Sequence, residues 1–303
     1  MTIAITGGTG FVGQMLLDHA LAAGLEMRAL TRRDQPARAG VEWVRGDLDD
    51  KAALRTLVRG AEAIIHVAGV VNASDAAGFK AGNVTGTMNL VEAAVATGTT
   101  RFVNVSSLAA RQPRLSLYGA SKAQAERLVA ASGLDWTTVR PPAVYGPRDT
   151  EMRDLFRMAK WGVVVLPPPG RLSVIHAADL ATLLLALLPS GENVTRATFE
   201  PDDGVADGWT NAEFARAIGH AAGRRKIWTP HLSRDALMRV SQVDAFLRRG
   251  KARLTADRVH YMCHPDWVSN PRNRVPQRIW QPAIATAAGL KETAVWYRAQ
   301  GWL

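Results

Sequence analysis

The sequence predicts an α/β fold in which a parallel sheet, covered by helices on both faces, is followed by a smaller C-terminal domain. In the first half of the chain, short and near-continuously apolar segments alternate with segments of helical periodicity. Strands of that kind are typical of a parallel sheet that is buried on both faces. The first apolar segment runs directly into a glycine-rich turn, and the second half shows a looser pattern. With 303 residues and 47% hydrophobic content, the chain can bury one large core or two smaller ones.

Six apolar segments are expected to form the strands: Ile3–Ile5, Glu26–Thr31, Val41–Val44, Ala63–Val67, Arg101–Val105 and Trp136–Arg140. The segments with helical periodicity are Met15–Leu21, Asp50–Val58, Asn83–Ala96, Tyr118–Ala131, Ala178–Leu188, Asn211–Ala222 and Ser233–Leu247. In such sheets ligands bind beyond the carboxyl ends of the strands, so the residues that follow each strand are the functional candidates. We expect the sheet domain to cover residues 1–200, with an excursion near residues 167–176, and the smaller domain to cover mainly residues 201–303.

The first strand leads into the turn Thr6–Gly13, which is followed by a helix. The first N–H groups of a helix lack partners and its dipole adds partial positive charge, so a pyrophosphate binds well there. Close approach of the phosphates requires a turn without side chains, and the glycines are spaced G-x-x-G-x-x-G. Because a strand precedes the turn and a helix follows it, we interpret it as the dinucleotide site of a Rossmann-type doubly wound sheet rather than as a plain glycine turn. The cofactor-binding candidates are Gly7, Gly10, Phe11, Val12 and Gly13.

The end of the second strand favours NADP as the coenzyme, with NAD as the alternative. In dinucleotide folds an acidic side chain at this position accepts hydrogen bonds from the ribose 2′-hydroxyl and would repel a 2′-phosphate. Here Thr31 stands where the acid is expected, and Arg32 follows it. A guanidinium binds a phosphate through two parallel charge-assisted hydrogen bonds. Arg33 is the second candidate for this contact, and Asp34 lies close enough to weaken the preference.

Tyr118 and Lys122 are four residues apart, which places them on one face of a predicted helix. A tyrosine with its ordinary pKa of about 10 is a poor base at neutral pH, but a nearby ammonium favours the phenolate. The pair can therefore act as a proton shuttle. Ser107 follows the fifth strand and could hydrogen-bond a reacting carbonyl oxygen, stabilising the alkoxide that forms there. Ser106 is the rival candidate, and a plain strand-end cap is the other explanation for either serine.

Several motifs occur together in an order that is typical of one enzyme family. They are Thr6–Gly13, Asn83–Thr87, the serines 106–107, Tyr118–Lys122, Arg140–Pro147, Ile175–Leu180 and the tail from Gly289-Leu290 to Trp296-Tyr297. Over nearly the whole length the chain resembles the extended short-chain dehydrogenase/reductases, the NAD(P)-dependent epimerase/dehydratase superfamily. The resemblance implies a Ser/Tyr/Lys active site at Ser107, Tyr118 and Lys122, with Lys122 also holding the nicotinamide ribose.

The same resemblance implies further cofactor contacts and an assembly. The implied contacts are Asp47 and Leu48 with the adenine, Ala68 and Gly69 along the cofactor, and Pro141, Ala143 and Val144 beside the nicotinamide. A homodimer through the helices around Asn89 and Tyr118 is expected on the same ground.

Within this family the chain looks similar to the hydroxysteroid dehydrogenase and dihydroflavonol reductase branch. Only Leu108–Leu117 separate the serines from the tyrosine, whereas the nucleotide-sugar enzymes usually have a longer loop. Leu254-Thr255 and Cys263–Trp267 also resemble the hydroxysteroid dehydrogenase and dihydroflavonol reductase branch. We therefore expect an NADP(H)-dependent oxidoreductase that interconverts a ketone and a secondary alcohol on a small or amphipathic substrate. The alternatives are a nucleotide-sugar epimerase or dehydratase, and a non-catalytic NADP-binding scaffold or sensor.

The formal net charge of +10 is concentrated late in the chain, where residues 224–278 contain 13 Lys and Arg against 4 Asp and Glu. Such a segment could favour anionic substrates or peripheral contact with an acidic membrane surface. We expect no nucleic-acid partner, since no recognisable binding module is found, and no metal site, because His260, Cys263 and His264 lack a fourth ligand. A single cysteine, no membrane-length apolar run and no room for a signal peptide predict a cytoplasmic protein.

Overall fold

The computed structural model describes residues 2–248 and 254–303, and the chain divides into two compact units. The first unit comprises residues 1–141, 180–200 and 273–281, and the second comprises residues 142–179, 201–272 and 282–303. Each unit is therefore assembled from segments that are far apart in the sequence. The expected boundary at residue 200 between two functional domains stays a prediction.

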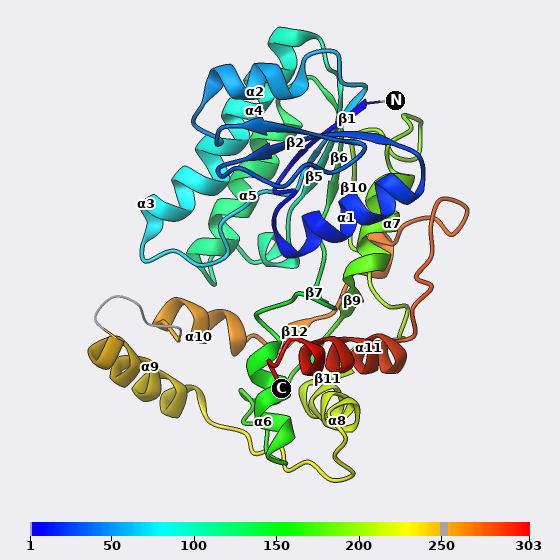
Figure 1. Ribbon diagram of the computed structural model, residues 1–303. Coiled ribbons are helices and arrows are strands. Elements are labelled where there is room, and N and C mark those ends of the chain that lie inside the picture. Colours follow the sequence, from blue (N-terminus) through cyan, green and yellow to red (C-terminus); the bar gives the residue numbers. More distant parts are fainter. Residues whose placement is uncertain (1, 249–253) are drawn as a thin grey trace. The chain divides into compact units, whose positions relative to one another are not determined.

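The first unit is built on a seven-stranded parallel sheet (Figure 1). Its strands are β1 (Thr2–Thr6), β2 (Glu26–Thr31), β3 (Val41–Arg45), β4 (Ala63–His66), β5 (Arg101–Val105), β6 (Asp135–Val139) and β10 (Ala197–Phe199). The order is β10-β6-β5-β4-β1-β2-β3, so the chain winds outward in both directions from the middle of the sheet. This order confirms the predicted doubly wound, Rossmann-type fold. It reverses between β1 and β4, and open α/β sheets bind their ligands at such a switch point.

Helices cover both faces of this sheet. On one face lie α2 (Lys51–Val58), α4 (Gly86–Thr97) and α5 (Leu117–Ala130), and on the other lie α1 (Phe11–Ala22) and most of α7 (Ala177–Ala186) (Figure 1). The core under the first group is formed by buried apolar side chains that include Leu54, Leu57, Ile64, Leu90, Phe102 and Val129. The central strands β1, β4 and β5 are almost entirely buried, as their near-continuous apolar sequences predict, whereas Glu42 and Arg45 of the edge strand β3 are exposed.

Local sequence explains where several of these helices begin and end. Asp50 caps α2 by accepting the backbone N–H groups of Ala52 and Ala53 at 3.0 and 2.9 Å, and Ser116 caps α5 in the same way. α4 ends at Gly98, whose φ of +76° favours glycine. The helix predicted to begin at Asn83 starts earlier, as α3 (Ala76–Phe79) and one π-helical turn, Lys80–Thr85.

The second unit combines two small sheets with several helices. β7 (Ala143–Tyr145) pairs in parallel with β9 (Val174–His176), and a three-stranded sheet has the order β11 (Trp209–Thr210), β8 (Arg171–Leu172), β12 (Asp266–Trp267). Its helices are α6 (Arg153–Lys160), α8 (Asn211–Ala221), α9 (Arg234–Arg248), α10 (Ala256–Met262) and α11 (Thr286–Ala299). Its core includes Tyr145, Phe156, Val174, Phe214, Leu290 and Tyr297. Among the described residues, no helix combines the length and the hydropathy needed to cross a membrane.

Candidate active site

The turn between β1 and α1 has the backbone shape of a pyrophosphate cradle. A Cβ at Gly13 would lie 2.0 Å from the carbonyl oxygen of Gly7, and one at Gly7, whose φ is +77°, would lie 2.7 Å from the backbone nitrogen of Ala68. A Cβ at Gly10 would meet only the Gly7 carbonyl oxygen, at 3.3 Å. Gly10 also begins α1 without any side-chain cap, so the N–H groups of the first turn are left for an anion. These residues fit a dinucleotide.

The end of β2 presents Arg32 on a turn that Thr31 holds. The Thr31 side chain is buried, and its hydroxyl donates to the carbonyl oxygen of Arg33 at 2.6 Å. Arg32 and Arg33 are exposed. Asp34, the nearby acid, forms an ion pair with Arg45. The carboxylate that would favour NAD therefore already faces a cation.

The predicted adenine contacts lie in the loop after β3. The Asp47 carboxylate accepts the backbone N–H groups of Asp49 and Asp50 at 2.9 and 3.1 Å, so it shapes the turn into α2. Asn89 of α4 donates its side-chain amide to the carbonyl oxygen of Leu48 at 2.9 Å. Asn89 therefore fixes the predicted adenine loop.

Ser107 and Tyr118 meet at the carboxyl end of β5. Ser107 caps the 3₁₀-helix Leu108–Arg111 by accepting the N–H of Ala109 at 3.2 Å, and its hydroxyl is also hydrogen-bonded to that of Tyr118. Burial raises the pKa of Tyr118 above its ordinary value of 10, and the hydrogen bond to Ser107 opposes that rise. Ser106 is buried, and its hydroxyl finds no partner among the described residues. Of the two serines, Ser107 is the one that contacts the tyrosine.

Lys122 is a buried cation one helical turn beyond Tyr118. Its ammonium donates to the carbonyl oxygen of Val105 at 2.8 Å, and only 6% of the residue is exposed. Burial lowers the pKa of Lys122 to about 8, while the negative charge of Glu126 acts in the opposite direction. A Cβ at Gly69 would lie 3.5 Å from the Lys122 ammonium, so the loop after β4 approaches this cation closely.

A chain of hydrogen bonds behind this loop was not predicted from the sequence. Burial and the charge of Lys122 lower the pKa of His66 to about 3, so its imidazole is neutral. The Thr87 hydroxyl donates to the carbonyl oxygen of Asn83 at 2.6 Å, so it accepts from Nε2 of His66 at 2.9 Å. Nδ1 of His66 then accepts from the Thr6 hydroxyl at 2.6 Å, and that hydroxyl accepts the N–H of Ala68 at 3.3 Å. The ends of β1 and β4 are joined in this way.

Asn83 holds the same loop against α5. Its side chain exchanges two hydrogen bonds with the backbone of Val70, at 2.7 and 2.9 Å, and donates to the Ser121 hydroxyl at 2.9 Å. Ser121 in turn donates to the carbonyl oxygen of Tyr118 at 2.7 Å. From the sequence, Asn83–Thr87 is recognisable only as a family motif. The contacts of Asn83 with Val70 and Ser121 become visible only in the fold.

Comparison with known proteins places the chain in a family. Residues 7–190 match the NAD(P)H-binding family, which is more than half of the chain. A ceramide reductase of Caulobacter vibrioides is 37% identical over 318 aligned residues, covering 99% of this chain and 96% of that protein. The chain belongs to the extended short-chain dehydrogenase/reductase superfamily. A 3β-hydroxysteroid dehydrogenase/Δ5→4-isomerase of Mycobacterium tuberculosis is 31% identical over 261 residues, covering 74% of this chain and 70% of that protein.

Solved structures of this superfamily share the fold. The UDP-glucuronic acid 4-epimerase from Bacillus cereus has a TM-score of 0.76 at 15% identity, covering 99% of both chains. The UDP-N-acetylglucosamine 4-epimerase from the same species has a TM-score of 0.71 at 20% identity, covering 98% of this chain and 96% of that chain. Likeness at such identities shows the fold alone. The relatives named reductases and dehydrogenases make this member an NAD(P)-dependent oxidoreductase, which confirms the predicted enzyme class and cofactor class.

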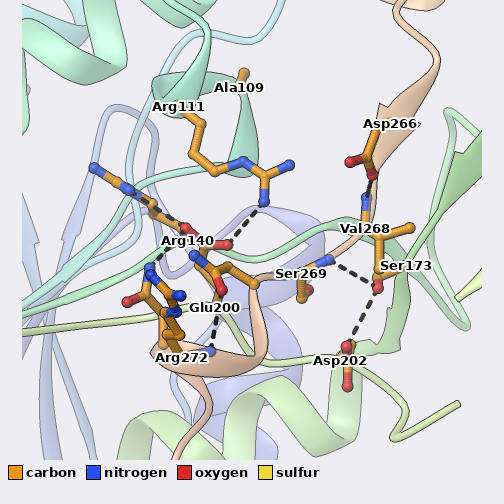
Figure 2. A network of polar contacts seen from close by, with 12 residues as sticks. Ala109, Arg111, Arg140, Ser173, Glu200, Asp202, Asp266, Val268, Ser269 and Arg272 are labelled. Carbon is orange, nitrogen blue, oxygen red and sulfur yellow. Dashed lines mark hydrogen bonds and ion pairs between the residues drawn. The ribbon is translucent and has the colours of Figure 1, made fainter. Parts of the chain in front are cut away.

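An ion-pair network begins on α5, the helix that carries the catalytic candidates Tyr118 and Lys122. Glu126, one turn beyond Lys122, receives two hydrogen bonds from Arg140, at 2.9 and 2.7 Å. Figure 2 shows the fully buried carboxylate of Glu200 between Arg111 and Arg140, at 3.1 and 3.4 Å. Asn273 also donates to Glu200, at 3.1 Å. Arg111 is the last residue of the 3₁₀-helix that Ser107 caps, whereas Arg140 follows β6 and Glu200 follows β10. The network therefore links the segment after Ser107 to the ends of these two strands.

The remaining cofactor candidates belong to both units, and the carbonyl oxygen of Pro141 accepts the N–H of Leu108, the neighbour of Ser107, at 3.0 Å. Pro141 ends the first unit, whereas Ala143 and Val144 belong to β7 of the second. Among the described residues, no three His, Cys, Asp or Glu side chains converge as metal ligands. The assignments of individual cofactor contacts stay predictions.

Proposed function

We propose that this enzyme uses NADPH to reduce the ketone of an amphipathic, ceramide-like lipid to a secondary alcohol. The observation that carries the substrate class is the 37% identity to a ceramide reductase over 99% of this chain. Ceramides are N-acylated long-chain amino alcohols, so a keto group on the long-chain base is the position at which carbonyl reduction gives the alcohol. The predicted preference for an amphipathic ketone over a nucleotide sugar is supported by this relative.

The chemistry is assigned to Ser107, Tyr118 and Lys122. Bound NADPH supplies the hydride to the carbonyl carbon. Ser107 donates a hydrogen bond to the carbonyl oxygen, and Tyr118 delivers the proton that this oxygen takes up. The Lys122 ammonium stabilises the phenolate left on Tyr118 and holds the nicotinamide ribose. The hydrogen bond between Ser107 and Tyr118 and the helical spacing to Lys122 support these roles.

The charge state of Tyr118 favours the reductive direction. Since burial raises its pKa above 10, the phenol keeps its proton across the neutral range. A protonated phenol is the form that reduction needs, whereas oxidation of the alcohol would need the phenolate. This charge state agrees with the proposed reductase activity.

The test is turnover of a synthetic N-acyl 3-keto long-chain base by the full-length protein, followed as NADPH oxidation and as formation of the alcohol. Tyr118→Phe should bind NADPH as the parent does and lose most of the turnover, because it removes only the transferable proton. Tyr261→Phe, which changes a tyrosine of α10, is the matched control and should retain turnover.

Three results would contradict the proposal. If Tyr118→Phe kept the parent's rate, the proton donor would be misassigned. Saturable UDP binding measured by calorimetry would favour the epimerase or dehydratase alternative. Tight NADPH binding without turnover of any carbonyl compound would favour the scaffold or sensor.

A further inference from the structure

Two tryptophans of the second unit lie on adjacent backbone segments with their side chains exposed. Trp161 follows α6 and is 82% exposed, and Trp228 follows α8 and is 69% exposed. The N–H of Trp228 donates to the carbonyl oxygen of Gly162 at 2.9 Å, and the N–H of Val164 donates to that of Trp228 at 2.9 Å. Val165, on the same short ribbon, is 40% exposed. Indole rings normally bury most of their large apolar area, so two exposed indoles on adjacent backbone segments indicate an interaction surface.

The surroundings of this pair are basic. Lys160 precedes Trp161, and Arg224, Arg225 and Lys226 closely precede Trp228; all four cations are exposed. Arg224 donates to the carbonyl oxygen of Lys160 at 2.8 Å, which brings the two basic segments together. Residues 155–170 and 214–234 contain seven Lys and Arg and neither Asp nor Glu. We call Trp161, Val165, Trp228 and these four cations the Trp161–Trp228 patch.

We propose that the Trp161–Trp228 patch docks the enzyme on an anionic phospholipid bilayer. Indole rings favour the membrane–water interface, where their apolar body meets acyl chains and their N–H meets headgroups. Lysine and arginine are attracted by the negative surface potential of such a membrane. Peripheral binding of useful strength needs both an apolar and an electrostatic contribution, and the patch supplies both. The inference does not depend on which substrate the enzyme reduces.

The charge of the patch and the apolar surface near it favour a bilayer over two other partners, a second copy of the chain and single-stranded nucleic acid. A symmetric contact would press the four cations of one patch against the same four of the other, and like charges brought together across an interface repel. Single-stranded nucleic acid would also pair with cations and stack on indoles. The same unit exposes further aliphatic and aromatic surface on α9, at Val243, Phe246 and Leu247, which suits acyl chains better than phosphates.

The experiment is vesicle flotation of the full-length protein without substrate, using phosphatidylcholine vesicles with and without phosphatidylglycerol. We expect binding to the anionic vesicles that weakens with added salt, together with a blue shift of tryptophan emission. Each cation near such a surface strengthens partitioning about fivefold, so Arg225→Gln/Lys226→Gln should weaken it about 25-fold. Trp161→Ala/Trp228→Ala should weaken it about tenfold or more and remove the blue shift.

The matched control is Arg55→Gln/Arg59→Gln, which removes the same charge from exposed positions at the end of α2 in the first unit. It should keep nearly the parent's vesicle binding. Unchanged NADPH affinity and thermal unfolding would show that all variants are folded. Failure of the parent to float with anionic vesicles would overturn the proposal. So would equal losses in the patch and control variants, a change from dimer to monomer in the tryptophan variant without vesicle binding, or tighter binding to single-stranded RNA than to vesicles.

Discussion

Arg32 is the residue to which we assign the choice of coenzyme. It is exposed at the end of β2, on a turn held by Thr31, and the neighbouring Asp34 is paired with Arg45. Losing a charged hydrogen-bond partner typically costs about 1.5–3 kcal/mol, so Arg32→Ala should weaken NADPH binding roughly ten- to hundred-fold and leave NADH nearly unchanged. Titration of both coenzymes by fluorescence measures this, with Arg33→Ala as the comparison. Equal affinities for NADH and NADPH in the parent would contradict the assignment.

The charge on Lys122 should set the alkaline limit of activity. Its pKa is lowered to about 8 by burial, so the ammonium, which we propose stabilises the tyrosinate, becomes the minor form above that value. The rate of ketone reduction should therefore fall as the pH rises through about 8. Because Glu126 raises the pKa of Lys122, Glu126→Gln should move this fall to lower pH.

Profiles of kcat/KM against pH for the parent and for Glu126→Gln measure the shift. Arg127→Gln, at an exposed position on the same helix, should leave the profile in place. If the two variants gave the same profile as the parent, Glu126 would not act on Lys122.

The sequence alone predicts those site residues whose partners lie close to them in the chain. Tyr118 and Lys122 share a helix face because they are four residues apart, and Ser107 lies at the end of a recognisable strand. His66 and Glu200 give no such signal, since their partners are distant in sequence. The contacts His66–Thr6 and Glu200–Arg111 join residues 60 and 89 positions apart. Only the strand order brings them together.

In the turn between β1 and α1, we expect Gly13 to be needed for the fold and Gly10 to be needed for binding the coenzyme. Gly13→Ala would place a Cβ 2.0 Å from the backbone of Gly7, so we expect a lower melting temperature and loss of NADPH binding. Gly10→Ala would meet only one atom, at 3.3 Å, so the fold should persist while the new methyl group obstructs the phosphates. Thermal unfolding without coenzyme distinguishes the two variants. Equal melting temperatures for both would contradict this division of roles.

The elements that the sequence predicts well are those with a strong pattern of their own. β2 and β5 match the expected bounds, α8 differs by one residue at its end, and α9 differs by one residue at each end, because their apolar spacing alone indicates the element. β7 and β10, each three residues long, and α6, in which only Phe156 and Ala159 are buried, give no comparable pattern. Such short elements form because their neighbours pair with them or cover them. The π-helical turn before α4 has no sequence signal of this kind.

For the whole molecule, the path of the chain determines what can fold alone. The chain passes from one unit to the other after residues 141, 179, 200, 272 and 281. Residues 142–179 therefore belong to a unit whose remaining parts lie beyond residue 200, and residues 273–281 complete the first unit from far downstream. Within the second unit, the rings of Phe156 and Tyr297 pack edge to face with their centroids 5.1 Å apart. The ring centroids of Tyr145 and Phe214 are 6.4 Å apart. A division of the sequence at residue 200 separates both pairs.

We therefore expect the fragment 1–200 to be unstable despite containing every strand of the large sheet. It would expose the apolar side chains of residues 142–179 and lose the contacts of Glu200 with Asn273 and of Thr182 with Trp280. Expressed alone, it should aggregate or unfold at a much lower temperature than the full chain and bind no NADPH. Co-expression with residues 201–303 as a separate chain supplies both missing parts and should restore soluble protein with NADPH binding. A monomeric fragment 1–200 that binds NADPH as the parent does would show that the first unit folds without its downstream segments.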